Sequence, residues 1–489
     1  MSRALTGPLS FGLLKALASP EGVGGFDYLA TDGQALPFTV ATTPPGVYDS
    51  NTDQTWFFWD AWNGELPLRV NVRVYDHATA TWSEIWTAGL SPLTNEDHGV
   101  PAAFRDAGGY WHVFFGSHNS PLQHWVTAAP DDPSLFVRQT AVDSDSAGLY
   151  TYAHPNLVGS AVYLFLRDTT DAADYSLVLK KGAISAGAVT WDSKVEIAKF
   201  GDGDSRWYQG TNVVRGTDIH MLATKALLND TKRQNVYYLI YDTLTGSVKN
   251  FDGSATVASG SFPIDLSTLN TSFRVVDQIT GGTDGNVPAL CFDAADHPHI
   301  AYMDGTSGGG WSLKHTMHDG SSWTSPATVG AFASNNILHR YDGFTVAPGQ
   351  DGGVEAWWVT ASAFAFTRGG DISRRKRSSG GVWGSAEVIR SAGATYGLDS
   401  PVMIRGGHSS ARVMFCEATG DATIEAGDLK IFAYGDAGYL RSRADSKFAF
   451  WKPSDLGAKL VRWFQSNDEP VYLTQVSGVV SHWKSKTDR

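Results

Sequence analysis

Cysteine, long apolar runs and excess basic charge are all scarce in this chain. Its 489 residues contain two cysteines, Cys291 and Cys416, which is too few for the disulfide framework of a small secreted domain. No run approaches the roughly 18 apolar residues of a membrane helix, so we expect no membrane span. The net charge of −12 argues against general binding to nucleic acid or anionic membranes, because both need a positive face. An anionic partner would therefore need a local basic pocket.

The N-terminal segment is apolar over Phe11–Ala18, but Lys15 interrupts it and it is short for the core of a signal peptide. We expect no cleavable signal and interpret residues 1–24 as an N-terminal arm. The compartment stays open, and extracellular action and association with a virion both fit this reading.

Glycine and aromatic residues are abundant. The 52 glycines and 12% aromatic content favour many short strands joined by tight turns. Alternating apolar and polar residues mark strands at intervals of several tens of residues, with no sustained helical period between them. These segments are Asn71–Asp76, Tyr110–Phe115, Ala161–Leu166, Asn235–Tyr241, His299–Tyr302, Val354–Val359 and Ala411–Phe415. The pattern predicts an all-β protein.

Two further patterns suggest a repeat. A turn of small or polar residues ends in tryptophan at Trp82, Trp191, Trp323 and Trp383. Prolines mark strand starts at Pro101, Pro155, Pro288 and Pro401, and the first two are 54 residues apart, which suits one four-stranded sheet per repeat. We predict a seven-bladed β-propeller of four-stranded antiparallel blades over residues 25–445, with a C-terminal extension, 446–489, that could close it. A stack of β-sandwiches is disfavoured because no Pro/Ser-rich linker interrupts the pattern.

Histidine, tyrosine and arginine side chains occur beside strand-like runs between Asp97 and Arg167. The segments are D-H-G-V-P-A around His98, G-S-H-N-S-P-L around His118, and Thr151–Arg167 with Tyr152 near its start. Imidazole, phenol and guanidinium together can remove a proton next to a carboxylate, so the set suggests chemistry on an acidic sugar. Arg167 ends an apolar strand, where a charge needs a partner such as Asp168 or a substrate anion.

The tryptophan turns resemble degenerate Asp-box turns of BNR-repeat propellers, best in H-D-G-S-S-W-T at His318–Thr324. Within that group, residues 97–208 resemble the ulvan lyase type, polysaccharide lyases that cleave uronic-acid-containing glycans. The matching residues are His98, His118, Tyr152, Arg167 and Tyr208. One departure is that Ala153 and His154 separate Tyr152 from Pro155, so Tyr150, expected to face the same side, is an alternative to Tyr152.

The resemblance implies β-elimination. Arg167 would neutralise the substrate carboxylate, and Tyr152 would act as base and also as acid. His98 and His118 would share carboxylate neutralisation and proton transfer, in roles that could be exchanged. Tyr208, Asn119 and Arg206 would bind substrate. Each of these residues also has a purely structural interpretation, in a turn, a loop or the packed core.

Two other functions stay open. The first is a non-catalytic glycan-binding or structural propeller, such as a phage tail or virion receptor-binding component that assembles with other subunits. The second is a sialidase-like hydrolase, but we find neither its arginine triad nor its Tyr/Glu nucleophile pair.

A metal site and a basic surface site for an acidic polymer are both less favoured. Cys291, His297 and His299 lie within nine residues, but zinc would need a further ligand such as His220 or His339. We therefore expect no metal or cofactor, and a structural metal near Cys291 and His299 is the less favoured alternative. The basic tract Arg374–Arg377 reads as an exposed strand or loop that could attract an acidic polymer.

Overall fold

The computed structural model describes most of the chain between residues 28 and 440. The described ranges are 28–34, 37–38, 44–62, 67–93, 98–140, 149–172, 174–203, 205–227, 233–279, 285–306, 310–332, 343–360, 369–393, 395–418, 429–436 and 438–440. Beyond them, the backbone is described at 460–464, 470–476 and 479–485.

The chain divides into two compact units. One comprises residues 28–78 and 82–440, and the other comprises residues 1–27, 79–81 and 441–489. The predicted arm, 1–24, lies outside the described residues. Within the predicted extension, 446–489, three strands pair antiparallel with one another in a sheet of their own: β35 (Leu460–Phe464), β36 (Pro470–Val476) and β37 (Val479–Ser485).

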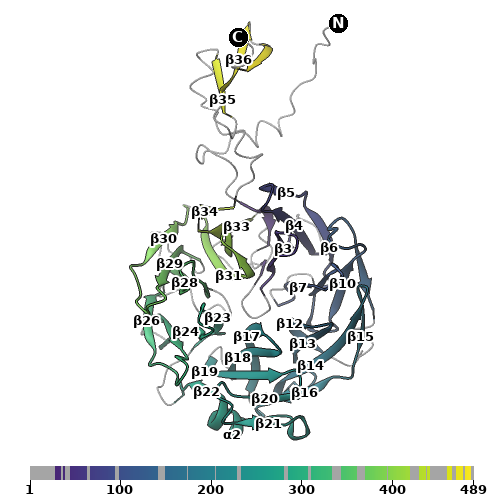
Figure 1. Cartoon of the computed structure of the whole chain (residues 1–489), viewed down its shortest axis with the longest axis vertical. Helices are drawn as coiled ribbons and strands as arrows, with labels where there is room; N and C mark the ends of the chain where they lie inside the picture. The colour runs from purple at the N-terminus through teal and green to yellow at the C-terminus, as the bar shows by residue number, and fades with distance from the viewer. Residues whose placement is uncertain are drawn as a thin grey trace. The chain divides into compact units, whose positions relative to one another are not determined.

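The larger unit consists of successive antiparallel runs of strands, which Figure 1 shows arranged around a central axis. The innermost strand of each run is its first, at β2 (Gly46–Asp49), β7 (Ala102–Arg105), β12 (Tyr150–Val158), β17 (Ser205–Arg215), β23 (Ala289–Phe292), β27 (Phe344–Pro348) and β31 (Gly397–His408). The second strands are β3 (Gln54–Ala61), β8 (Trp111–Phe115), β13 (Ala161–Asp168), β18 (Asp218–Leu227), β24 (Pro298–Thr306), β28 (Val354–Thr360) and β32 (Ala411–Ala418). This architecture confirms the coarser part of the prediction, an all-β, propeller-like fold.

Further strands extend each run outward. The third strands are β4 (Arg69–Asp76), β10 (Gln123–Thr127), β14 (Asp174–Ser185), β19 (Arg233–Asp242), β25 (Gly310–Met317), β29 (Asp371–Arg377) and β33 (Leu429–Gly435). The outer strands are β5 (Thr81–Trp82), β6 (Trp86–Leu90), β11 (Phe136–Gln139), β15 (Ala188–Trp191), β16 (Val195–Ala198), β20 (Ser247–Lys249), β21 (Thr256–Val257), β26 (Ala327–Ala331), β30 (Glu387–Arg390) and β34 (Gly438–Tyr439). Short insertions are β9 (His118–Ser120), η2 (Ser259–Ser261), α2 (Leu266–Thr268), η3 (Leu269–Phe273) and β22 (Arg274–Val276).

An early strand closes the last sheet. β1 (Ala30–Gly33) pairs antiparallel with β33 and also touches β3, where Gly33 lies opposite Ala61. β31 in turn pairs with β2 at Arg405 and Val47. Gly33 suits this position because a Cβ there would meet the carbonyl oxygen of Leu429 at 3.0 Å. Pairing between distant parts of the chain therefore closes the circle, which leaves fewer exposed sheet edges.

The tryptophan turns join neighbouring runs. In the turn at His318–Thr324, the Asp319 carboxylate accepts hydrogen bonds from the backbone N–H groups of Ser321 and Ser322, both at 2.9 Å, as an Asp-box turn requires. Trp323 then packs edge-on against Tyr238 of the preceding run, with ring centroids 5.1 Å apart. Trp191 and Trp383 contact the preceding run in the same way, through His124 and His315. Trp82 differs, because its recorded ring contacts are with its own run.

Buried polar pairs recur at one position of the sheets. Each joins the second strand of a run to the third strand, one diagonal step away in the register. The pairs are His112–His124 at 3.0 Å, His220–Tyr238 at 2.6 Å, His299–His315 at 2.9 Å and Glu355–Arg374 at 3.4 Å. Hydrogen bonding within each pair offsets the cost of burying these polar groups.

Candidate active site

His98 and His118 lie face to face. Their ring centroids are 3.9 Å apart and their planes differ by 3°. The close approach of two glycine-containing loops produces this arrangement. The N–H of Gly116 donates to the carbonyl of Gly99 at 2.7 Å, and a Cβ on Gly99 would meet the Gly116 Cα at 3.1 Å. The small residues beside both histidines therefore allow the stack to form.

Tyr152 approaches this stack from β12. Its ring centroid lies 5.6 Å from that of His98, and the side chain is buried. The backbone of Tyr152 has φ of 59°, a conformation that is costly for a bulky residue. The same segment shifts the register between β12 and β13, from Thr151 to His154. Such strain at a bulge is typical of positions that aim a side chain at a functional site.

Tyr150 and Tyr152 do not share an environment. Tyr150 packs in a hydrophobic core cluster with Phe104 and Phe114, and Lys194 lies 5.7 Å from its ring. Tyr152 instead contacts His98. The expectation that both tyrosines face the same side was wrong, because the bulge and the positive φ at Tyr152 break the alternation of the strand. The geometry therefore favours Tyr152 over Tyr150 as the site residue.

Arg167 lies near the end of β13 and is 2% exposed. Its guanidinium stacks over the rings of Tyr152 and Tyr208, at 4.6 Å from each centroid. Asp168, which we considered as its partner, accepts a hydrogen bond from Lys194 at 2.8 Å. The cation is thus held between aromatic faces, a favourable geometry for a buried guanidinium.

Tyr208 and Arg206 both come from β17. Tyr208 lies 5.8 Å from Tyr152 between ring centroids, so it belongs to the same group. Arg206 lies beside Tyr175 across the parallel pairing of β14 and β17, with its guanidinium 4.9 Å from that ring. Asn119, the remaining predicted residue, is exposed next to His118 with φ of 52°, and its backbone N–H donates to the Thr151 hydroxyl at 3.3 Å.

Tyr175 and Arg233 are two members of the group that the sequence analysis missed. Arg167 stacks on Tyr175 at 5.0 Å, and Arg233 stacks on Tyr208 at 4.5 Å. With the contacts above they form an alternating stack, which we call the arginine–tyrosine ladder: Arg206, Tyr175, Arg167, Tyr208 and Arg233. The register of the β13–β14 hairpin, with Arg167 opposite Leu177, would have placed Tyr175 near Arg167. We find no comparable local signal for Arg233.

The ladder concentrates positive charge beside the histidine stack. Three guanidinium groups lie along one row of phenol rings, in a protein whose net charge is −12. Such a local basic region suits an anionic ligand despite the acidic whole. Two imidazoles and a phenol next to it can transfer protons.

The candidate metal residues have other partners. His299 contacts Asp293 through Nε2 at 3.2 Å and His315 through Nδ1 at 2.9 Å. His297 contacts the same Asp293 oxygen at 3.3 Å. Burial raises the pKa of the Cys291 thiol well above its usual value, which disfavours the thiolate that binds zinc. Among the described residues, no group of three or more His, Cys, Asp or Glu side chains is placed to hold a metal ion, and His339 lies outside them.

The basic tract at Arg374–Arg377 is partly used within the fold. Arg374 is buried and bonds Glu355 at 3.4 Å and Glu387 at 2.7 Å, and Arg375 donates to two backbone carbonyls. The expectation of an exposed strand or loop was wrong for Arg374, since this residue lies in the interior of a sheet.

In the described part of the chain, no helix is long and apolar enough to cross a membrane.

Comparison with known proteins identifies a family for this chain. A family model described as "BNR repeat-containing family member" matches residues 62–329, more than half of the chain. The chain belongs to this family. Within it, the protein is homologous to ulvan lyases at modest identity: it is 23% identical over 470 residues to an ulvan lyase of Alteromonas sp. (strain LOR), covering 84% of this chain and 87% of the relative. It is also 24% identical over 350 residues to an ulvan lyase of Nonlabens ulvanivorans, covering 62% and 70%.

A solved structure shares the fold of this BNR-repeat protein. That structure is a polysaccharide lyase, PL25 ulvan lyase, bound to -[GlcA(1-4)Rha3S]-, and it superposes with a TM-score of 0.68 at 19% identity. The match covers 88% of this chain and all of the solved chain. The likeness establishes a common architecture.

Proposed function

We propose that this protein is a polysaccharide lyase that cleaves a uronic-acid-containing glycan by β-elimination. The observation that carries the proposal is the contact between side chains from distant positions. His98, His118, Tyr152, Arg167 and Tyr208 form one connected group, with neighbouring ring and guanidinium centres 3.9–5.8 Å apart. The homology to ulvan lyases supports the same reaction class.

In the proposed reaction, Arg167 and one histidine face the substrate carboxylate. Neutralising this carboxylate makes the proton at C5 of the uronate more acidic. The Tyr152 phenolate takes that proton and becomes the neutral phenol, the electron pair forms the C4–C5 double bond, and the bond from C4 to the glycosidic oxygen breaks. Tyr152 or the other histidine returns a proton to the departing oxygen. Proton transfer by positioned groups of this kind contributes about 10²–10⁴-fold to a rate.

Substrate binding is assigned to the flanks of this group. Tyr208 would position the sugar, Arg206 would meet an anionic group, and the exposed Asn119 would contact the chain near His118. A polymeric substrate would be met outside the cell, so we also propose extracellular action.

We further propose that the strand runs of the larger unit are seven propeller blades. The inner strands β2, β7, β12, β17, β23, β27 and β31 each contribute residues to one cavity on the axis. A single central channel lined by the first strand of every blade is typical of propellers. In this arrangement β1 completes the last blade, a role that we had considered for the C-terminal extension.

The test is incubation with a panel of uronate-rich glycans while the ultraviolet absorbance of the unsaturated product is followed. We expect absorbance to rise with at least one glycan and a Tyr152→Phe variant to be nearly inactive. Binding without any such rise over the whole panel would instead support the non-catalytic glycan-binding propeller. The relatives named above are lyases, which favours turnover over that alternative and over a phage tail or virion component.

A further inference from the structure

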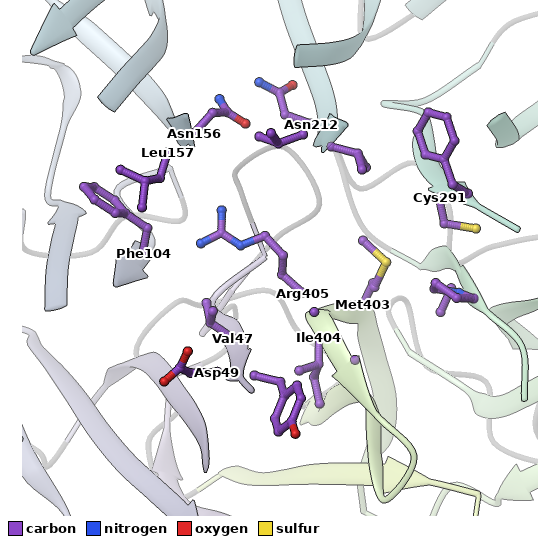
Figure 2. Close-up of a pocket in the computed structure, with 18 of the residues that line it drawn as sticks. Val47, Asp49, Phe104, Asn156, Leu157, Asn212, Cys291, Met403, Ile404 and Arg405 are labelled. Atoms are coloured by element: carbon purple, nitrogen blue, oxygen red, sulfur yellow. The ribbon is translucent and has the colours of Figure 1, made fainter. Parts of the chain in front are cut away.

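A cavity of about 530 Å³ lies on the axis of the larger unit, where Figure 2 shows side chains from several inner strands around one space. It is separate from the candidate active site. The β12 residues in its wall are Asn156 and Leu157, whereas Tyr152 lies near the opposite end of that strand. Four residues of extended chain span about 13 Å. The volume is within the usual range of small-ligand sites.

The wall of this cavity is rich in arginine. Four guanidinium groups line it, and Asp49 is the one carboxylate among its lining residues in the described part of the chain. Three of the four arginines have carboxylate partners: Arg105 with Asp131 at 2.7 Å, Arg215 with Asp296 at 3.2 Å and Arg412 with Asp436 at 2.7 Å. Asp49 lies 3.4 Å from Arg105, so its charge is also already engaged.

Arg405 differs from these three. Figure 2 shows its guanidinium near the middle of the ring of lining residues. It donates hydrogen bonds to the backbone carbonyls of Pro155, at 3.2 Å, and Ala103. No carboxylate among the described residues pairs with it. Burial lowers the pKa of Arg405 to about 10, so the group still carries its positive charge at neutral pH.

A negatively charged ligand would stabilise the positive charge of Arg405. A guanidinium has five N–H donors, and the two carbonyl bonds leave others available. Arg405 is half-buried, and a charge withdrawn from water without a counter-charge is costly. Asn212, also in the wall, provides a second observation: Gln209 donates to its side-chain oxygen at 2.7 Å, while its buried amide nitrogen has no acceptor among the described residues. Both residues therefore have donor capacity that an acceptor ligand would use.

We propose that the axial cavity is a binding site for a small inorganic anion, a halide or an oxyanion, held against Arg405. The bound anion supplies the counter-charge that no described carboxylate provides for Arg405. Because Arg405 extends from β31 to the carbonyls of β7 and β12, occupancy also stabilises the contact between distant runs of the ring. This proposal does not depend on the lyase activity.

The direct test is diffraction from crystals of the full chain soaked in sodium bromide. We expect an anomalous bromide peak next to the Arg405 guanidinium. Peaks confined to the outer surface, or ordered water alone in the cavity, would overturn the proposal.

A second test uses thermal unfolding in solution at constant sodium concentration, with chloride, bromide or phosphate replacing the bulky gluconate ion. Anion binding to the folded state should raise Tm by about 1–3 °C, and the increase should level off once the site is saturated. Arg405→Gln should abolish the increase, whereas the matched cavity variant Arg215→Gln should keep it. If Arg405→Gln fails to fold, Arg405→Lys, which keeps the charge, is used to show whether a cation at this position preserves the response. Equal Tm in all anions for the wild-type chain would contradict the site.

Discussion

Exchanging Tyr152 for phenylalanine separates catalysis from packing, because the change removes one hydroxyl and keeps the ring. The ring contacts with His98 and Tyr208 and the stacking of Arg167 at 4.6 Å all remain available to phenylalanine. Because the ring contacts persist, we expect the free energy of unfolding to change by no more than about 1 kcal/mol. If the hydroxyl carries the proton, kcat should fall about 10²–10⁴-fold, or about 3–5 kcal/mol of transition-state stabilisation.

Tyr150→Phe is the matched control. Tyr150 precedes Tyr152 by two residues, belongs to the same strand and is equally buried at 1% exposure. Its ring packs in a core cluster rather than against His98, so this variant should lose similar stability but keep kcat within about twofold.

The assay is initial-rate measurement of unsaturated product, with urea unfolding of all three proteins. If Tyr152→Phe keeps wild-type turnover, Tyr152 is not the proton carrier. If Tyr150→Phe loses as much activity as Tyr152→Phe, the distinction drawn from the bulge is wrong.

Three further predictions concern other parts of the molecule. Arg233→Met should lower kcat/KM about 10–100-fold in steady-state kinetics, because Arg233 stacks on Tyr208, and Arg233→Lys should recover part of it; unchanged kinetics would remove Arg233 from the site. The free energy of unfolding should decline as the pH falls from about 6.5 towards 4, because burial lowers the pKa of His299 to about 4 and of His315 to about 2. Over this range protons bind the unfolded chain before the folded one, and each histidine contributes at most about 1.4 kcal/mol per pH unit. A urea midpoint that does not change with pH would contradict this. Trp323→Ala should cost roughly 2–3 kcal/mol in urea unfolding because the half-buried ring joins two runs, whereas Val382→Ala, at a side chain 69% exposed, should cost under about 0.5; similar losses would argue against the joining role.

Much of the architecture was predictable because its signals are local. Alternation over segments such as Ala161–Leu166 and Val354–Val359 marks strands that the structure contains. The Asp319 turn was recognisable because its hydrogen bonds join residues two and three positions apart. The closing role of β1 was not predictable in this way, since its partners Leu429 and Ile431 lie about 400 residues later.

The site was only partly predictable for a related reason. The segments around His98 and His118 indicated the residue types, and the structure brings these two side chains together. The choice between Tyr150 and Tyr152 depended on a bulge, which regular alternation cannot reveal. Asp168, which we expected as a partner of Arg167, accepts a hydrogen bond from Lys194, and adjacent residues of a regular strand point to opposite faces.

The sequence by itself determined the strands, the turns and the chemical types available for proton transfer and for binding an anion, since these depend on neighbouring residues. Only the tertiary structure decided which of these groups meet. The arginine–tyrosine ladder and the place of the Arg405 guanidinium in the axial cavity both depend on contacts between separate strands, which the register and closure of the sheets bring together. Long-range pairing of this kind depends on packing of the whole ring, which no local pattern records.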